Sequence, residues 1–174
     1  MKKSRKILWI SLFFLLIFAV IFAVASRKII RTRDGAADLL LHELQLADDE
    51  AAVACVGEFE ANNRVLLWFT VQTQDRTLYQ AVDCKPLALG GYLIMDVRKP
   101  MIYAQDIVHV VWMAKDVFLI NNSECRVIAV DSGTSGDAVS RIELSPDDLP
   151  YVFPDGVSGS GKLDFLDAEG NPVR

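Results

Sequence analysis

Gly156, Gly161 and Lys162 come closest, by their spacing, to a motif that does chemistry. They fit G-x-x-x-x-G-K, the pattern of a loop whose backbone amides hold phosphate groups. Such a loop needs a Ser or Thr at the next position to hold magnesium, and this chain has Leu163 there. It also needs a long helix behind it, whereas residues 162–166 have a strand-like pattern. We therefore expect a Gly/Ser loop here and not a nucleotide site.

The two histidines, His42 and His109, belong to no metal-binding pattern. There is no His-x-x-x-His or HExxH spacing, and the cysteines show no CxxC spacing, so a zinc site has little support. No nucleophile, base and charge stabiliser occur at a workable spacing either. The sequence therefore predicts no catalytic, cofactor-binding or metal-ligating residue, no cofactor, and a protein that is not an enzyme.

Two acidic segments could supply oxygen ligands to calcium. Residues 131–137 and 164–170 each contain several carboxylates close together. Neither segment matches the D-x-[DN]-x-[DN]-G loop with its distal Glu. We interpret both as ordinary turns.

The three cysteines, Cys55, Cys84 and Cys125, allow at most one intramolecular disulfide. Cys84 and Cys125 both fall at the ends of predicted strands, and they are the candidate pair in an oxidising compartment. Cys55 would then remain a core thiol. Three separate core thiols are the alternative.

Three aromatic residues, Trp68, Tyr79 and Tyr92, point away from the most apolar face of their predicted strands. If neighbouring strands pair, these side chains lie close together and form an aromatic patch on the surface. Clustered surface aromatics are typical of binding sites, so we take the three as a candidate binding patch. The alternative is a second packing face beneath the C-terminal segment.

The elements that would position these residues begin with an apolar run, Ile7 to Ala25, of 19 residues without a charge. A helix over this run reaches roughly 28 Å, close to the hydrocarbon thickness of a bilayer. Trp9 lies near one end, where aromatic side chains favour the headgroup interface. We predict a transmembrane helix over 7–25 that serves as a signal anchor.

Charge divides the chain sharply, with +8 over residues 1–33 and −13 over residues 34–174. Basic residues flank the apolar run on both sides, and the α-amino group with Lys2 and Lys3 favours an N-terminus inside the cell. We therefore expect a single-pass protein of the cell membrane with an extracytoplasmic C-terminal domain. The acidic domain argues against a nucleic-acid partner.

After the apolar run, hydrophobic residues recur first at the spacing of a helix and then at every second position, as in a strand. Apolar residues at helical spacing predict an amphipathic helix over 36–46, and alternation such as that of residues 64–72 predicts strands. The predicted fold class is α+β: the transmembrane helix, then one amphipathic helix packed on a mainly antiparallel β-sheet of about six or seven strands.

Composition divides the chain into four parts: a basic tail at 1–6, the transmembrane helix at 7–25, a basic connector at 26–35, and one strand-rich acidic domain at 36–174. Gly, Pro, Ser and Asp are frequent toward the end of this domain. That composition predicts a loosely structured C-terminal part.

These features favour a single-pass membrane-anchored protein whose extracytoplasmic domain binds a protein or a small ligand without catalysis. Its expected partners are the lipid bilayer, through residues 7–25, another envelope protein, and a ligand of unspecified class. One alternative is an accessory or regulatory subunit of a membrane protein complex. Another is a secreted hydrolase released by signal cleavage after Ala25, because Ala23-Val24-Ala25 resembles a signal-peptidase site.

Overall fold

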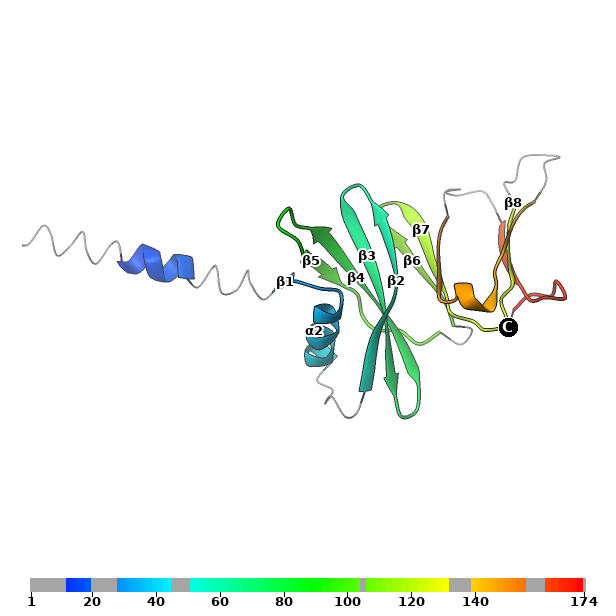
Figure 1. Cartoon of the computed structure of the whole chain (residues 1–174), viewed down its shortest axis with the longest axis horizontal. Coiled ribbons are helices and arrows are strands. Elements are labelled where there is room, and N and C mark those ends of the chain that lie inside the picture. The colour runs from blue at the N-terminus through cyan, green and yellow to red at the C-terminus, as the bar shows by residue number, and fades with distance from the viewer. Residues whose placement is uncertain are drawn as a thin grey trace, which may run out of the picture.

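The computed structural model describes residues 12–19, 28–44, 51–103, 106–131, 139–155 and 162–173 (Figure 1). Within these residues the chain is mostly β and forms three sheets, of five, three and three strands. Every paired strand is antiparallel to its neighbour. The sheets and one helix lie as successive layers, with α2 at one end and the third sheet at the other (Figure 1).

The largest sheet has the order β1-β5-β4-β3-β2. The almost unbroken apolar run of residues 65–71 explains why β3 is buried on both faces, since a strand covered on one side only would alternate with polar residues. Its neighbour β4 is buried on both faces as well, although it contains the polar residues Gln80 and Asp83. Asn62 and Asn63 close the β2–β3 hairpin with φ of 50° and 58°, the conformation that a two-residue hairpin turn requires. The strands are β1 (Ile29–Ile30), β2 (Ala51–Ala61), β3 (Arg64–Thr73), β4 (Thr77–Pro86) and β5 (Tyr92–Val97).

Helix α2 (Asp34–Leu44) covers one face of this sheet. Its residues Ala36 and Leu40 are fully buried against Val65, Leu67 and Phe69 of β3, which face one way because a strand alternates its side chains. The first core cluster is the group between the helix and the sheet: Ile30, Ala36, Leu40, Val65, Leu67, Phe69, Val82, Cys84 and Ile94.

The opposite face of the same sheet is covered by a second sheet of order β10-β7-β6. Gly57 of β2 allows the close approach, because a Cβ there would lie 2.6 Å from Cγ2 of Val152. The strands are β6 (Ile107–Trp112), β7 (Lys115–Ile120) and β10 (Tyr151–Asp155). The second core cluster fills this layer: Leu66, Trp68, Tyr79, Ala81, Val108, Val110, Trp112, Val117 and Leu119.

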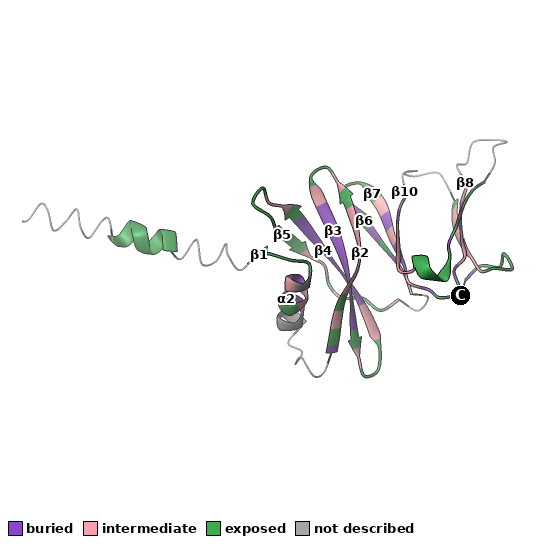
Figure 2. Ribbon diagram, in the orientation of Figure 1, coloured by how far each residue is buried: buried purple, intermediate pink, exposed green. Residues whose placement is uncertain are grey.

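A third sheet, of order β11-β8-β9, packs on the outer side of the second. Figure 2 shows buried positions continuing from the first sheet through the second into this layer. Its elements are β8 (Val127–Asp131), β9 (Ser140–Glu143), the short helix η1 (Pro146–Asp148) and β11 (Lys162–Leu166). The third core cluster joins it to β7 and β10: Ile120, Cys125, Ile128, Leu144, Phe153 and Val173.

Residues 12–19 form a helix that lies apart from the layered body in Figure 1. All eight of its side chains are exposed, including Phe14, Leu15 and Phe18 at 65%, 69% and 71%. None of the described helices is long and apolar enough to cross a membrane.

The predicted fold class is wrong. In place of an α+β fold with a transmembrane helix and one sheet of six or seven strands, the structure is mostly β, has three sheets, and has its first helix at 12–19. The single sheet fails for a physical reason. The second apolar face of β3 and β4 has to be covered, and β6 and β7 fold over it instead of extending the same sheet.

Candidate functional site

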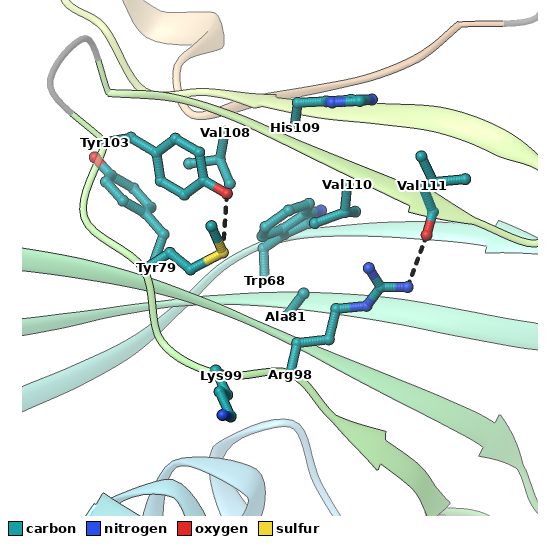
Figure 3. Close-up of a pocket in the computed structure, with 11 residues that line it drawn as sticks. Trp68, Tyr79, Ala81, Arg98, Lys99, Tyr103, Val108, His109, Val110 and Val111 are labelled. Carbon is teal, nitrogen blue, oxygen red and sulfur yellow. Dashed lines mark hydrogen bonds between the residues drawn. The ribbon is translucent and has the colours of Figure 1, made fainter.

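An apolar hollow on the domain, here called the cleft, lies between the second face of the five-stranded sheet and strand β6 (Figure 3). It has a volume of about 360 Å³, within the range of small-molecule sites. Its lining residues come from β3, β4, β6 and the segment that joins β5 to β6: Trp68, Tyr79, Ala81, Arg98, Lys99, Met101, Tyr103, Val108, His109, Val110 and Val111.

Trp68 and Ala81 form part of the cleft wall because β3 and β4 direct these residues to the same face of the sheet. They are directly paired across the two strands, and they are 1% and 2% exposed. The indole N–H of Trp68 is buried and has no hydrogen-bond partner within the described residues. An unpaired buried donor costs about 1–3 kcal/mol, so an acceptor placed against it would be stabilised.

Tyr79 is held in place by its hydroxyl. The hydroxyl donates to Oδ1 of Asp106 at 2.7 Å and accepts from Nδ2 of Asn121 at 2.9 Å. Burial raises the pKa of Tyr79 to about 12, while the hydrogen bond from Asn121 opposes the rise and Asp106 adds to it. The phenol is therefore neutral at physiological pH and fixes the segment around Asp106 against the sheet.

Tyr103 stands over the mouth of the cleft, and its hydroxyl lies 3.2 Å from the sulfur of Met101 (Figure 3). Burial raises the pKa of Tyr103, while the positive charge of Arg98 opposes that rise. Its ring meets the ring of Tyr79 edge to face at 6.3 Å between centroids. Thioether sulfur is a weak acceptor, so the Tyr103 hydroxyl is available to a better one.

Arg98 brings a positive charge to the cleft. Its Nη2 donates to the carbonyl oxygen of Val111 at 2.7 Å, while its Nε is buried with no partner among the described residues (Figure 3). Lys99 follows it, exposed, with its ammonium directed away from Trp68 in Figure 3. The cleft therefore has a cation beside an apolar wall.

His109 contributes little chemistry to the cleft. Its ring is turned toward the other side of β6, where it stacks on Phe118 at 4.7 Å and its Nε2 lies 2.6 Å from Oδ1 of Asp116. A base engaged in this way has no nucleophile to activate in the cleft. Across the described part of the chain, no three His, Cys, Asp or Glu side chains are grouped as metal ligands would be.

A second hollow, of about 560 Å³, lies beside the bulge of β2. Its charged residues, Arg33 and Glu58, pair with each other, with Nη2 lying 2.6 Å from both carboxylate oxygens. Because each charge neutralises the other, this hollow offers a ligand less than the cleft does.

The predicted aromatic patch does not exist as one surface. Trp68 and Tyr79 are buried together in the second core cluster and line the cleft, whereas Tyr92 packs against the first cluster on the opposite face of the sheet. Trp68 and Tyr79 lie on a second packing face of the sheet, but β6 and β7 cover it where the alternative expected the C-terminal segment. Tyr92 differs because β5 contains a bulge opposite Asp83 and Cys84, which shifts the alternation of its side chains.

The structure does not contain the candidate Cys84–Cys125 disulfide. Both are free thiols, Cys84 in the first core cluster and Cys125 in the third, and the second sheet lies between these clusters. Burial raises the pKa of Cys84 to about 12 and also raises that of Cys125. Both thiols are therefore protonated core groups.

The segments interpreted as loops and turns, 131–137, 156–161 and 164–170, lie only partly within the described residues. Lys162–Leu166 is strand β11, so no helix follows the glycine-rich segment, whose residues 156–161 lie outside the described ones. Residues 132–138 lie outside them as well. Asp167 accepts hydrogen bonds from the backbone N–H groups of Glu169 and Asn171, which lower its pKa and make an ordinary turn.

Arg98, Met101 and Tyr103 line the cleft although no sequence pattern indicated them. A signal for the cleft was present in residues 65–71, an almost unbroken apolar run that predicts a strand covered on both faces. Comparison with protein-family models, with curated proteins and with solved structures gave no match to this chain, so a functional conclusion has to come from its own residues.

Proposed function

We propose that this protein is a membrane-tethered, non-catalytic binding protein, held to the bilayer by residues 7–25, with its layered domain on the extracytoplasmic side. The observation that carries the proposal is the helix at 12–19, which exposes apolar side chains around its whole circumference. Water-exposed apolar surface of this extent is a marker of a membrane or protein contact. The uncharged run that contains this helix favours lipid as the contact.

The cleft supports the binding part of the proposal. It combines apolar walls with a few polar groups, which is the usual composition of a ligand site. Tyr79 is neutral and already bonded, and His109 is paired outside the cleft. These engagements favour recognition of a ligand over general acid–base chemistry.

Vesicle flotation tests the tether. The full chain is expected to float with phosphatidylcholine vesicles, and a Leu15→Asp/Phe18→Asp variant is expected to remain in the aqueous fraction, because an aspartate near the centre of a bilayer costs about 3 kcal/mol. Leu89→Asp is the matched control, since Leu89 is fully exposed on the domain, and this variant should float. A wild-type chain that stays in the aqueous fraction would refute the tether.

Proteolysis tests the orientation. Protease added outside intact spheroplasts is expected to digest the domain and leave a cytoplasmic control protein whole. Digestion only after the membrane is opened would place the domain inside and overturn that part of the proposal.

A further inference from the structure

We infer that the cleft binds a small carboxylate that carries an apolar tail. This inference rests on the proposed binding function and gives its ligand a chemical class. It follows from three properties of the cleft: the hydrogen-bonding character of its side chains, its charge and its walls.

The available polar side chains of the cleft are donors. They are the guanidinium of Arg98, the indole N–H of Trp68 and the hydroxyl of Tyr103, which can also accept. The ammonium of Lys99 is directed away from Trp68 (Figure 3) and adds its charge at a greater distance. The Tyr79 hydroxyl is excluded because Asp106 and Asn121 already occupy it. An ionised carboxylate accepts hydrogen bonds and donates none, so it matches such a lining.

The charge of the cleft is opposite to that of the domain. Arg98 and Lys99 are among its lining residues, and no aspartate or glutamate is among the described residues that line it. Residues 34–174 have a net charge of −13. Two carboxylates that contact lining residues are engaged, Asp106 by Tyr79 and Asp116 by His109. The positive charge of the cleft attracts an anion, whereas the remaining acidic surface of the domain repels one.

Two of the donors are buried without a partner within the described residues, Nε of Arg98 and Nε1 of Trp68. Both belong to residues that line the cleft, and Trp68 is 1% exposed. Leaving such groups unpaired is costly, whereas a carboxylate beside a guanidinium forms the strong charge-assisted hydrogen bonds for which arginine is suited. A small rotation of the Arg98 side chain would turn its guanidinium toward an entering carboxylate.

The apolar lining residues of the cleft determine what kind of tail the carboxylate carries. Ala81, Met101, Val108 and Val110 are apolar, and the volume of about 360 Å³ is at the small end of ligand sites. A medium-chain monocarboxylate suits these walls better than a sugar acid or an inorganic anion, which would leave polar groups against valine and methionine.

The test uses the full chain, labelled with ¹⁵N at tryptophan, in phosphatidylcholine nanodiscs. The chain has three tryptophans, and Trp68→Phe identifies the indole signal of Trp68. Octanoate is expected to shift that signal saturably, while acetate, 1-octanol and octylamine, at the same free concentration fixed by dialysis against empty nanodiscs, are expected to bind at least about tenfold more weakly.

Matched variants locate the effect. Arg98→Gln is expected to weaken octanoate binding about tenfold or more, and Arg141→Gln, which removes the same charge from an exposed position on β9, is expected to leave it unchanged. Ala81→Met narrows the cleft without altering a charge and should also weaken binding. If Arg98→Gln does not fold, Ala81→Met still shows whether octanoate binds in the cleft, and the comparison of octanoate with 1-octanol still tests the carboxylate.

The outcomes separate the two proposals. Equal binding of octanol and octanoate, or an Ala81→Met effect without an Arg98→Gln effect, would overturn the carboxylate and leave the cleft as a binding site. No saturable shift with any of the compounds would overturn the inference, while vesicle flotation would still report independently on the tether.

Discussion

Tyr79 shows how one hydroxyl connects segments that are distant in sequence. It bonds Asp106, at the start of β6, and Asn121, just after β7, while its backbone pairs with Met101. Asp106 has a φ of 51°, a conformation that needs outside support in a residue other than glycine. The tyrosine therefore fixes the wall of the cleft that carries Met101 and Tyr103.

We predict that Tyr79→Phe lowers the free energy of unfolding at pH 7 by about 1–3 kcal/mol, because it leaves Asp106 and Asn121 without their shared partner. Urea unfolding followed by circular dichroism measures the change. Tyr151→Phe is the control, since the Tyr151 hydroxyl makes no hydrogen bond within the described residues, and it should alter stability by less than about 0.5 kcal/mol.

The same variant has a pH signature. The pKa of Tyr79 is raised from 10 to about 12 on folding, so folding favours the neutral phenol. That contribution is complete below pH 10 and is lost as pH rises toward 12 and beyond. The difference in stability between wild type and Tyr79→Phe should thus be constant from pH 7 to 9 and shrink between pH 10 and 12. A difference that grows in that window would contradict the assignment.

At the scale of elements, the β2–β3 turn and the β6–β7 turn contrast in their residues. Asn62 and Asn63 suit the left-handed conformation that a two-residue turn requires, and the sequence predicts a turn there. Met113 and Ala114 adopt the same conformation between β6 and β7, with φ of 50° and 60°. The sequence carries no turn signal at those positions, and the packing of both strands on the second core cluster imposes the turn.

Ala114→Gly should raise the free energy of unfolding by about 0.5–1 kcal/mol. Relief of the left-handed alanine is worth about 1–2 kcal/mol, and the greater freedom of glycine in the unfolded chain offsets about half of it. Ala37→Gly, inside α2, is the matched control and should lower stability by about 0.5–1 kcal/mol. A loss of stability from both variants would show that the Met113–Ala114 turn is not strained.

At the scale of the whole molecule, Phe118 connects the second and third layers. Its ring on β7 lies 5.5 Å from that of Phe165 on β11 and 6.5 Å from that of Phe153 on β10. The neighbouring residues Val117 and Leu119 face the second core cluster instead. Strand β7 therefore contributes to two cores at once, and the contact between Phe118 and Phe165 joins the third layer to the second.

Phe118→Ala should destabilise the protein by about 2–4 kcal/mol, somewhat less than a fully buried phenylalanine because Phe118 is only half-buried. Hydrogen exchange is expected to accelerate more in the amides of β8 and β11 than in those of β3 and β4. Met95→Ala, at a position 45% exposed, should change neither. Uniform acceleration across all three sheets would mean that the third layer has no separate opening.

Several features follow from the sequence alone. Apolar residues at helical spacing predict a helix at 36–46, and α2 occupies 34–44. Alternation over 64–72 predicts a strand, and β3 covers 64–73 with Val65, Leu67 and Phe69 on one face. These patterns are local, since the repeat of side-chain direction is fixed by backbone geometry within a few residues.

The tertiary structure decided which faces meet. Alternation places Trp68 on the second face of β3 but does not specify that β6 covers it. It also does not specify that β8 pairs with β9 and β11 and not with the preceding strand β7. A bulge in β5 exposes Met95 and buries Ile94, against the predicted alternation. Strand partners and the cleft depend on contacts between distant segments, and a sequence period determines a face without determining its neighbour.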